Sequence, residues 1–583
     1  MTEHFEVLER DGAARLGEVR LSDPVRTPAL VDDVLEDAGS AWVAERDVPE
    51  GDQSVLTVLP HRGFPSGTPE EVQEAFAEPV EPPDNPSAAV ISAHTAADLG
   101  TDAYLLSGGP GIVGHASAFV EAVIRTRRGI PDDTALGLSG VATPRNAALL
   151  AYAGVDLMDT DRAVVQGTRG RYLTTEGAYD LEALDELPCP CPACAVPSEE
   201  FGREACVEHN TNALEAELRR VRRRIRDGQL RDYLEGQVRH ATWLTAALRE
   251  LDQEWAYLEE RTPIYRGRDL RSTTEDTISR VEIQRFAERV TERYERRIRD
   301  VPLLLVPCSA TKPYSESQSH GQFQDAARYR GHLVSMTSPI GVVPQELELT
   351  YPAQHYDSAV TGVWTETEID FVARVLEKYL DRTDYPRVVA HVPGEGYRTI
   401  VERALEGRDL PVTYTVEDHP TTDASLGALS DALEDERTIQ LAERERATLQ
   451  AIADHQFGAG AGDALFDDVE IRGRYPKLQA IDDGDQLAAL VPRYGTLALT
   501  IAGARAWESS GIPTKRVTID EFVPHGSVLA PGILDADESI RPGDEVVIEG
   551  PAAFGVGRAS MHGAAMVEST RGESVDVRHV TER

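Results

Sequence analysis

The feature that most constrains this chain is a cluster of cysteines on one short, proline-rich stretch. Pro-Cys-Pro-Cys-Pro-Ala-Cys places Cys189, Cys191 and Cys194 within six residues. In an intracellular chain this spacing favours a metal site over a disulfide framework. Three thiolates and one further ligand suit tetrahedral Zn²⁺, which is usually fully ligated when it is structural. The spacing therefore predicts a structural zinc site, with its fourth ligand either Cys206 or His209, which stands just before an expected helix.

The order of apolar and polar stretches predicts a multidomain α/β protein. At about 150 residues per domain, the length allows about three to five domains. Residues 1–184 and 299–435 each alternate short apolar runs with helical stretches, as α/β domains do. Residues 185–298 hold the cysteines and then long, charged helical segments. Residues 436–514 open with a helix and continue as β-runs, and residues 515–583 are β-rich and punctuated by Gly and Pro.

The charge balance is strongly acidic. Asp and Glu number 100 against 59 Lys and Arg, which gives a net charge of -41. Only four of the cations are lysines: Lys312, Lys378, Lys477 and Lys515. A carboxylate-rich surface almost without lysine suits multimolar salt, where self-repulsion is screened. The composition therefore predicts a protein of a halophilic organism, with an acidic mesophilic protein as the alternative.

Neither a membrane protein nor a secreted protein fits the sequence. A bilayer-spanning helix needs about 20 consecutive apolar residues, and the chain contains no such stretch. Its first residues, MTEHFEVLERDGAARLG, lack the apolar region of a signal peptide. We expect a soluble cytoplasmic protein without a membrane partner. Because the overall charge is acidic, any nucleic-acid binding is expected at local arginine clusters.

The densest group of reactive side chains lies in residues 307–320, PCSATKPYSESQSH. The preceding VPLLLV predicts a buried strand, and open α/β sheets bind ligands at the carboxyl ends of their strands. Cys308 is a candidate nucleophile, or else a small buried apolar residue. Lys312 stands where this chain would ordinarily use Arg, which indicates a compact, titratable ammonium that binds an anion or acts as a base. His320 is a candidate proton shuttle, or else it caps the loop.

Hydroxyl groups of the same loop are expected to act as hydrogen-bonding partners: Tyr314, Ser315 and Ser317. Two further polar stretches also follow apparent strands. We expect them to line the same pocket: His355, Tyr356 and Asp357 in one, and Gly394, Glu395 and Tyr397 in the other.

The densest basic cluster is RRVRRRIR, residues 219–226. Its arginines Arg219, Arg222, Arg223 and Arg226 are candidates for tracking the phosphates of a nucleic acid. The alternative is a helix whose arginines are balanced by glutamates at i,i+4 spacing, such as Glu215 and Glu217. The sequence favours neither interpretation.

Several segments resemble the archaeal tRNA-guanine transglycosylase superfamily, over about two thirds of the chain. These are FEVLERDGAARLGEVRL at the start, SGG at 107–109, GVDLMDT at 154–160, and RGRYLTTEG with CPCPAC and EHN around the cysteines. ADHQFGAGAGDALF resembles the family's C-terminal domains. The resemblance implies a (β/α) barrel, a nucleophilic aspartate at Asp159, and His209 as the zinc ligand beside Cys189, Cys191 and Cys194.

Two departures from the transglycosylases put base exchange in doubt. Their aspartate immediately before SGG is Leu106 here, and a leucine cannot accept a hydrogen bond from a base. Gly154 follows Gly108 by only 46 residues. A complete (β/α)₈ barrel needs about 250 residues, so we expect a remnant barrel from which the middle is missing, with Asp159 as a vestigial nucleophile.

The loop at 307–320 resembles the Pro-Cys-x₃-Lys-Pro-Tyr-x₂-Ser-x₂-His signature of the archaeosine synthases, paralogues of the transglycosylases. The matching positions are Pro307, Cys308, Lys312, Pro313, Tyr314, Ser317 and His320. The resemblance implies conversion of the nitrile of 7-cyano-7-deazaguanine, already in the tRNA D-loop, to an amidine. It further implies an amine donor, lysine or glutamine, and a radical-SAM partner protein that completes the reaction.

The end of the chain, from about Lys515, resembles PUA domains in HGSVLAPGILDADESIRPGDEVVIEG, GVGRASM and RGESVDVRHV. Short β-runs broken by Gly and Pro predict a small barrel. Gly526, Pro531 and Gly532 lie where the backbone is expected to approach RNA closely. Upstream, residues 416–427, VEDHPTTDASLG, resemble an interdomain linker.

Three functions are weighed. The first is nitrile-to-amidine conversion on tRNA by Cys308, Lys312 and His320, which most of the motif residues favour. The second is base exchange that inserts the deazapurine into tRNA, which Asp159 keeps open and Leu106 opposes. The third is a non-catalytic tRNA-binding subunit, for which the reactive loop has no use. The oligomeric state, a homodimer included, stays open.

Overall fold

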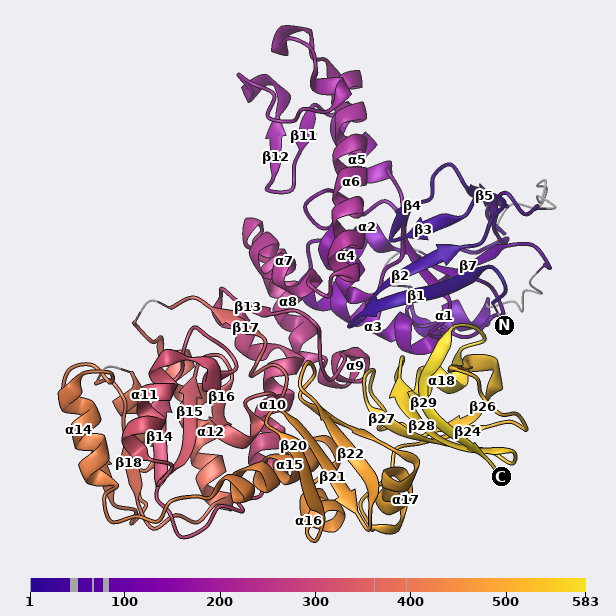
Figure 1. Cartoon of the computed structure of the whole chain (residues 1–583). Helices are drawn as coiled ribbons and strands as arrows, with labels where there is room; N and C mark the ends of the chain where they lie inside the picture. Colours follow the sequence, from indigo (N-terminus) through magenta and orange to yellow (C-terminus); the bar gives the residue numbers. More distant parts are fainter. Residues whose placement is uncertain (1, 42–50, 65–67, 77–82, 361, 395) are drawn as a thin grey trace. The chain divides into compact units, whose positions relative to one another are not determined.

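The computed structural model describes residues 2–41, 51–64, 68–76, 83–360, 362–394 and 396–583. The chain forms two compact units (Figure 1). The first contains Met1–Thr262 with Leu529–Ile533 and Met561–Ser574, and the second contains the remaining residues. The division after Thr262 falls inside the segment 185–298 drawn from the sequence. Its cysteine-bearing part belongs to the first unit, and its last helix belongs to the second.

Parallel strands form the main sheet of the first unit. The chain opens with an antiparallel sheet of β1 (Phe5–Asp11), β2 (Ala14–Val19) and β3 (Val25–Thr27). The next sheet has seven strands in the order β4-β10-β9-β8-β7-β6-β5, and every neighbouring pair is parallel. Its strands are β4 (Ala29–Leu30), β5 (Leu35–Asp37), β6 (Leu56–Val58), β7 (Ser87–Ile91), β8 (Ala103–Leu106), β9 (Ala135–Leu138) and β10 (Leu157–Met158). This curled sheet confirms the predicted barrel remnant.

The 46-residue interval after Gly108 explains why the barrel does not close. It contains a single strand, β9, with helices before and after it. The helices among these strands are α1 (Glu70–Ala75), α2 (Gly109–Ile112), α3 (Ala116–Gly129), α4 (Ala147–Ala153) and α5 (Asp161–Thr168). One strand cannot supply the remaining strands and crossover helices that a closed eight-stranded barrel needs.

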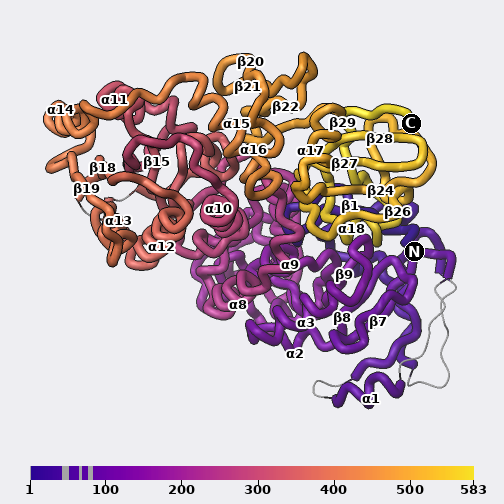
Figure 2. Tube along the Cα trace, turned by 90° about the horizontal axis from the view of Figure 1, so that it is seen from below, coloured from indigo at the N-terminus to yellow at the C-terminus, as the bar shows by residue number. Residues whose placement is uncertain are grey.

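A small hairpin and four further helices follow in the first unit. The hairpin pairs β11 (Arg171–Leu173) with β12 (Ala178–Asp180) and leads into the cysteine loop. The helices are α6 (Arg203–Arg226), α7 (Leu230–Gln237), α8 (Thr242–Gln253) and α9 (Trp255–Arg261). Helices α3 and α8 lie side by side (Figure 2).

The second unit is organised around a five-stranded sheet in the order β16-β15-β14-β18-β19. Strands β14 (Leu303–Pro307), β15 (His332–Thr337), β18 (Val388–Ala390) and β19 (Val412–Tyr414) are parallel, and β16 (Gly341–Pro344) is antiparallel. Along β14, Leu303 and Leu305 enter one apolar cluster, whereas Leu304 and Val306 enter another. This period of two shows that both faces of the sheet are covered.

Helices cover the two faces. Residues of α10 (Val281–Glu292) and α12 (Glu366–Arg382) share the cluster of Leu303 and Leu305. Residues of α11 (Gln318–Ala327) and α14 (Asp423–Ala432) share the cluster of Leu304 and Val306. Helix α13 (Tyr397–Ala404) follows β18, and the two short strands β13 (Leu270–Ser272) and β17 (Tyr356–Ser358) pair in parallel.

The prediction of a linker at residues 416–427 is wrong. This stretch leads directly into α14, which packs on the sheet. The Thr422 side chain caps the helix by accepting the Ser425 N–H at 3.3 Å. The Asp418 carboxylate accepts hydrogen bonds from the hydroxyl groups of Thr422 and Ser425. Asp, Thr and Ser are common in linkers and in N-caps for the same reason, because their short side chains bind the local backbone.

The rest of the second unit is richer in antiparallel strands. Helices α15 (Leu441–Phe457) and α16 (Ala461–Phe466) precede a sheet of β20 (Glu470–Arg474), β21 (Lys477–Asp482), β22 (Asp485–Val491) and β23 (Thr496–Leu499), followed by α17 (Ile501–Ser509). The terminal sheet has the order β25-β29-β28-β27-β24-β26. Its strands are β24 (Arg516–Ile519), β25 (Ser527–Leu529), β26 (Ile533–Ala536), β27 (Glu545–Glu549), β28 (Ala553–Ala559) and β29 (Glu573–Glu582). Helix α18 (Gly563–Glu568), between β28 and β29 in the sequence, belongs to the first unit. Among the helices that the structure describes, none is long and apolar enough to cross a membrane.

Candidate functional site

The motif PCSATKPYSESQSH lies at the carboxyl edge of the five-stranded sheet. Strand β14 ends at Pro307, and the Cys308 N–H donates to the Met336 carbonyl of β15 at 3.2 Å. The chain then passes through a short loop into α11. Parallel strands end together at this edge, so the loop lies where β15 and β18 also end. This is the location predicted from the apolar run VPLLLV.

Cys308 is a free, half-buried thiol beside a tyrosine of α13. Its Sγ lies 3.4 Å from the Tyr397 hydroxyl oxygen. Burial raises the pKa of Tyr397, and the negative charge of a Cys308 thiolate raises it further. The phenol therefore stays protonated and can donate to the sulfur. Tyr397 was expected from the sequence to line the same pocket, and this contact places it there.

Lys312 lies over an aromatic ring. Its Nζ is 3.8 Å from the centroid of the Tyr356 ring, a cation–π distance. Burial lowers the pKa of Lys312, and the nearby charges of Cys308, Asp357 and Asp269 oppose that shift only in part. A lysine whose pKa is lowered can exchange a proton closer to neutral pH than an exposed one. An arginine could not do so.

A short chain of hydroxyl groups fixes the ring under Lys312. The Tyr356 hydroxyl lies 2.6 Å from that of Tyr314 and 2.6 Å from that of Thr337, at the end of β15. Burial raises the pKa of both tyrosines, Tyr314 and Tyr356, and the charge of Cys308 adds to the effect. Both rings therefore remain neutral, and their hydrogen bonds hold the loop against the sheet.

Ser317 and His320 have structural positions in the loop. Ser317 is the N-cap of α11, and its hydroxyl accepts the His320 N–H at 3.2 Å. The His320 Nε2 donates to the Pro307 carbonyl at 3.0 Å, and its ring stacks on Tyr314 with centroids 4.9 Å apart. Burial lowers the pKa of His320 to about 4. A neutral imidazole that anchors the loop matches the capping alternative better than the proton-shuttle prediction.

Of the other residues predicted from the sequence, one acts on Lys312 and one contacts residues elsewhere. Asp357 acts on Lys312 through its charge. His355 Nδ1 instead lies 3.3 Å from Asp269, and its Nε2 lies 3.2 Å from the Arg493 carbonyl. Glu395 lies outside the described residues. Cys308, Lys312, Tyr314, Tyr356 and Tyr397 therefore form the candidate reactive group.

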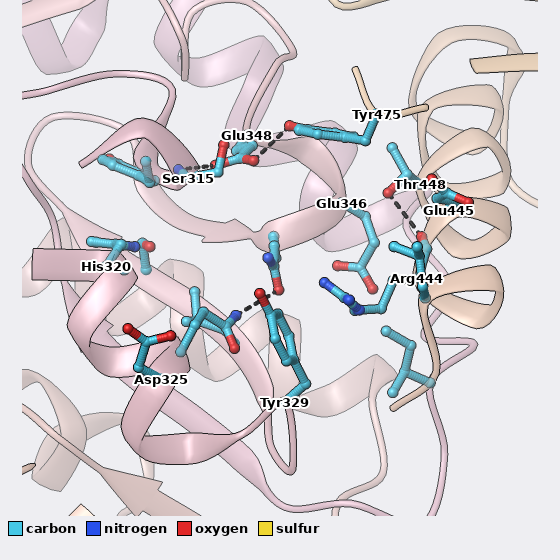
Figure 3. A pocket seen from close by; sticks show the side chains of 18 residues that line it. Ser315, His320, Asp325, Tyr329, Glu346, Glu348, Arg444, Glu445, Thr448 and Tyr475 are labelled. Atoms are coloured by element: carbon cyan, nitrogen blue, oxygen red, sulfur yellow. Dashed lines mark hydrogen bonds between the residues drawn. The ribbon is translucent and has the colours of Figure 1, made fainter. Parts of the chain in front are cut away.

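A cavity of about 340 Å³ lies on the other side of Tyr314 and His320 (Figure 3). Sequence reasoning did not predict it. It is lined by the motif loop, α11, β15, the 3₁₀ turn Gln345–Leu347 that follows β16, and the first turns of α15. Besides Tyr314 and His320, the polar side chains that line it are Ser315, Gln324, Asp325, Tyr329, Ser335, Gln345, Glu346, Glu348, Arg444, Glu445, Thr448 and Tyr475.

Two buried carboxylates of the cavity have pKa values that are shifted in opposite directions. Glu348 accepts the Ser315 N–H at 2.8 Å and the Tyr475 hydroxyl at 2.5 Å, and burial raises its pKa. Burial acts on Glu346 in the same sense, but His332, whose Nε2 lies 3.0 Å from both carboxylate oxygens, outweighs it and lowers the pKa of Glu346. Glu346 is therefore ionised at neutral pH.

The zinc ligands predicted in the first unit come together. The ligand atoms of Cys189, Cys191, Cys194 and His209 all lie within 4.8 Å of one another. His209 Nδ1 is 3.3 Å from Cys194 Sγ and 3.6 Å from Cys191 Sγ, which lie 3.6 Å apart. A tetrahedron with Zn–S of about 2.3 Å and Zn–N of about 2.0 Å has edges of about 3.5–3.8 Å. The cluster therefore fits a fully ligated Zn²⁺.

The surroundings of His209 select its metal-facing nitrogen. Its Nε2 donates to the Leu173 carbonyl at 2.9 Å, and its ring stacks on Tyr172 at 3.7 Å. Such an outer-shell bond fixes the tautomer that leaves Nδ1 free for a metal. Cys206 is fully buried in the adjoining apolar cluster and is not part of the ligand group. One expectation was wrong, since His209 lies inside α6, which begins at Arg203 rather than after His209.

Family models match four consecutive parts of the chain. A model described as queuine tRNA-ribosyltransferase matches residues 65–242, and a domain of unknown function matches residues 283–433, which include the reactive loop. The patch-forming domain C2 of tRNA-guanine transglycosylase matches residues 447–513, and the PUA domain matches residues 515–581.

Curated relatives match the whole chain. The archaeosine synthase of Haloferax volcanii is 60% identical over 586 residues, which is 100% of both chains. The chain belongs to the archaeosine synthase family. The archaeosine synthase subunit alpha of Methanosarcina acetivorans is 42% identical, with 100% of both chains covered. The tRNA-guanine(15) transglycosylase of Methanothermobacter thermautotrophicus is 29% identical and covers 79% of this chain and 68% of its own.

Asp159, predicted from the sequence to be a vestigial nucleophile, is held by backbone hydrogen bonds within the protein. Asp159 follows β10, and both of its carboxylate oxygens accept the Gly140 N–H at 2.9 Å. Burial raises the pKa of Asp159. Leu106 closes β8 as a buried side chain. The carboxylate is thus already hydrogen-bonded within the protein, and the end of β8, which β9 separates from β10, offers an apolar group.

The arginines of α6 are paired with carboxylates. Arg219 and Arg222 bind Glu215 at 2.9 and 3.0 Å, and Arg223 binds Asp227 at 2.9 Å. Arg226 lies 3.7 Å from Glu9. The alternative of a helix balanced by its own acids is therefore present in the structure. Contact of these arginines with RNA stays a prediction, because exposed pairs of this kind are weak and exchangeable.

The three PUA-domain positions are surface backbone. Gly526 is exposed with φ of 86°, a conformation that favours glycine, and open space surrounds its Cα. Pro531 and Gly532 lie in the short 3₁₀ turn Ala530–Gly532. RNA contact at these positions also stays a prediction.

Proposed function

We propose that this chain is a tRNA-modifying transferase of archaeosine biosynthesis, which adds an amine to the nitrile of 7-cyano-7-deazaguanine in tRNA. Family membership supports the pathway. The observation that carries the chemistry is the group at the sheet edge, where a free thiol, a lysine of lowered pKa and a protonated phenol meet. A binding module has no need for this combination.

The proposed first step forms a thioimide. The Cys308 sulfur bonds to the nitrile carbon, and one π pair of the C≡N bond moves to nitrogen. The neutral Lys312 amine accepts the thiol proton and passes it to that nitrogen, while the Tyr397 hydroxyl orients the sulfur. His320, whose pKa is about 4, keeps the loop in place.

The second step releases the product. The donor amine bonds to the thioimide carbon, the C–S bond breaks, and the sulfur leaves with its bonding pair. One proton of the attacking amine returns to the sulfur through Lys312. The sum is one nitrile plus one amine giving one amidine, with Cys308 regenerated, so no oxidant or reductant is required.

The other parts of the chain have supporting roles in this proposal. Cys189, Cys191, Cys194 and His209 hold a structural Zn²⁺, which cross-links the cysteine loop to α6. The PUA domain binds tRNA. The donor is lysine or glutamine, and a radical-SAM protein is the proposed partner, in keeping with the name subunit alpha of one relative. We place the protein in the cytoplasm.

The deciding experiment is mass spectrometry of nucleosides from nitrile-bearing tRNA after incubation with the protein and each amine. A nucleoside heavier by the mass of one amine is expected. Unmodified tRNA incubated with labelled guanine forms the second arm. Label incorporation together with an unchanged nitrile nucleoside would instead support base exchange through Asp159.

A further inference from the structure

The cavity behind the reactive loop contains a carboxylate, Glu346, and a guanidinium, Arg444, and different neighbours hold each of them in place. The side chains of Glu346 and Arg444 point into the same part of it (Figure 3). Glu346 is ionised, and the network of His332 and Tyr385 fixes it, with His332 Nδ1 2.5 Å from the Tyr385 hydroxyl. Both carboxylate oxygens keep lone pairs beyond the bond to His332. A fixed anion in an enclosed space is suited to an ammonium group.

Arg444 is positioned without an anion. Its guanidinium lies 3.8 Å above the Tyr329 ring. Among the residues that the structure describes, its buried Nε has no hydrogen-bond partner. Buried polar atoms are rarely left unpaired, because each costs about 1–3 kcal/mol. The stacked guanidinium therefore presents unused donors in a flat geometry that matches a carboxylate.

The backbone under Arg444 supports a binding role. Arg328 and Tyr329 are consecutive non-glycine residues with φ of 49° and 55°, in the left-handed region. Such a conformation costs about 1–3 kcal/mol per residue and clusters at binding sites. Here it turns the chain out of α11 and brings the Tyr329 ring beneath the guanidinium.

We propose that this cavity binds the amine donor as a free basic α-amino acid, an inference that rests on the function proposed above. Arg444 binds the α-carboxylate, and Glu346 binds the α-ammonium. The volume of about 340 Å³ lies within the range of about 300–1,000 Å³ for small-ligand sites. Besides Glu346, the acids Asp325 and Glu445 line the cavity against the one arginine among the described residues of its lining, so a basic side chain is favoured over a neutral amide.

The cavity also borders the reaction. The Tyr314 ring lines it, while the Tyr314 hydroxyl bonds to the tyrosine that carries Lys312. His320 lines it as well and binds the carbonyl of Pro307, next to Cys308. Tyr314 and His320 are therefore the side chains that stand between a donor bound in the cavity and Cys308, which does not line it.

Calorimetric titration of the full-length protein with amino acids, without tRNA, tests the site. L-lysine is compared with 1,5-diaminopentane, which lacks the carboxylate, and with 6-aminohexanoate, which lacks the α-ammonium. Arg444→Gln should weaken the binding of L-lysine by about tenfold or more and leave the binding of 1,5-diaminopentane unchanged. Glu346→Gln should weaken the binding of L-lysine more than it weakens the binding of 6-aminohexanoate.

Arg398→Gln is the matched control. Arg398 is also half-buried and stacked on a tyrosine, 4.3 Å from the Tyr414 centroid, with an unpaired Nε, but it does not line the cavity. It should leave L-lysine binding unchanged. Equal losses in Arg398→Gln and Arg444→Gln, tighter binding of L-glutamine than of L-lysine, or no binding of L-lysine would each overturn the inference.

The titration separates two failures. If L-lysine binds with the expected dependence on Arg444 but tRNA gains no mass, the site stands and the proposed transfer fails. If tRNA gains the mass of the amine while Arg444→Gln leaves both the binding of L-lysine and its KM unchanged, the proposed function is supported and the donor binds at a different site.

Discussion

Asp159 and Cys308 each follow a parallel strand, one in each compact unit, yet their surroundings differ. Both oxygens of Asp159 accept a backbone N–H, and the end of β8, two strands along the sheet, offers the apolar Leu106. Cys308 instead meets a phenol, and Lys312 rests on a ring rather than on a carboxylate. Asp159 is thus held by the backbone, whereas Cys308 and Lys312 contact aromatic side chains that can orient a sulfur and an ammonium toward a substrate.

The sharpest way to break this comparison is to disable each group in turn. Cys308→Ala should lower the single-turnover rate on nitrile-bearing tRNA by about 10³-fold or more, because it removes the nucleophile. Asp159→Asn, which keeps size and shape, should stay within about twofold of wild type. A loss of less than about tenfold in Cys308→Ala would show that the amine adds directly, without a thioimide.

The next largest effect is expected for Lys312→Arg. The charge is kept, but arginine cannot release a proton in the working pH range, so the rate should fall by about 10²- to 10⁴-fold. Because burial lowers the pKa of Lys312 and the neutral amine is the active form, the wild-type rate should rise with pH and level off below the ordinary lysine pKa. A near-wild-type rate in Lys312→Arg would reduce the loop to a phosphate clamp.

A smaller effect on rate is expected for His320→Gln. The wild-type imidazole is neutral, and glutamine can still donate to the Pro307 carbonyl, so the rate should change by less than about tenfold. A fall of about 10²-fold or more would restore His320 as a proton donor.

The same variant has a signature in stability. With a pKa of about 4 in the folded state against about 6.5 unfolded, His320 contributes stability above pH 6.5 that is lost as the pH falls toward 4. Between pH 7.5 and 5, wild type should lose about 2 kcal/mol more than His320→Gln. Urea unfolding at the two pH values measures the difference.

The reactive loop and its strand were predictable because both are local in the sequence. An apolar run places Cys308 and Lys312 at a sheet edge, and the scarcity of lysine marks Lys312. The state of His320 was not predictable, because its pKa depends on burial created by packing. Arg444 and Tyr329 were missed for a related reason. The helix α15 carries Arg444 to the motif from a distant segment, and no spacing rule connects the two.

The smallest effect on chemistry, and the largest on folding, is expected for the zinc ligands. Cys191→Ala should leave less than about half an equivalent of Zn²⁺, where wild type should hold one, because a closed site needs all four ligands. The free energy of zinc binding is folding free energy, so thermal unfolding should begin at a lower temperature. At saturating tRNA the folded protein should keep a rate within about twofold of wild type, since Cys308 and Lys312 belong to the other unit.

Cys206→Ala is the matched control: it removes a buried thiol of the adjoining apolar cluster that is not a ligand, so it should retain the metal. Loss of zinc in Cys206→Ala together with retention in Cys191→Ala would reassign the ligand set, and a rate that falls in proportion to zinc content would end the separation between a structural unit and a reactive one.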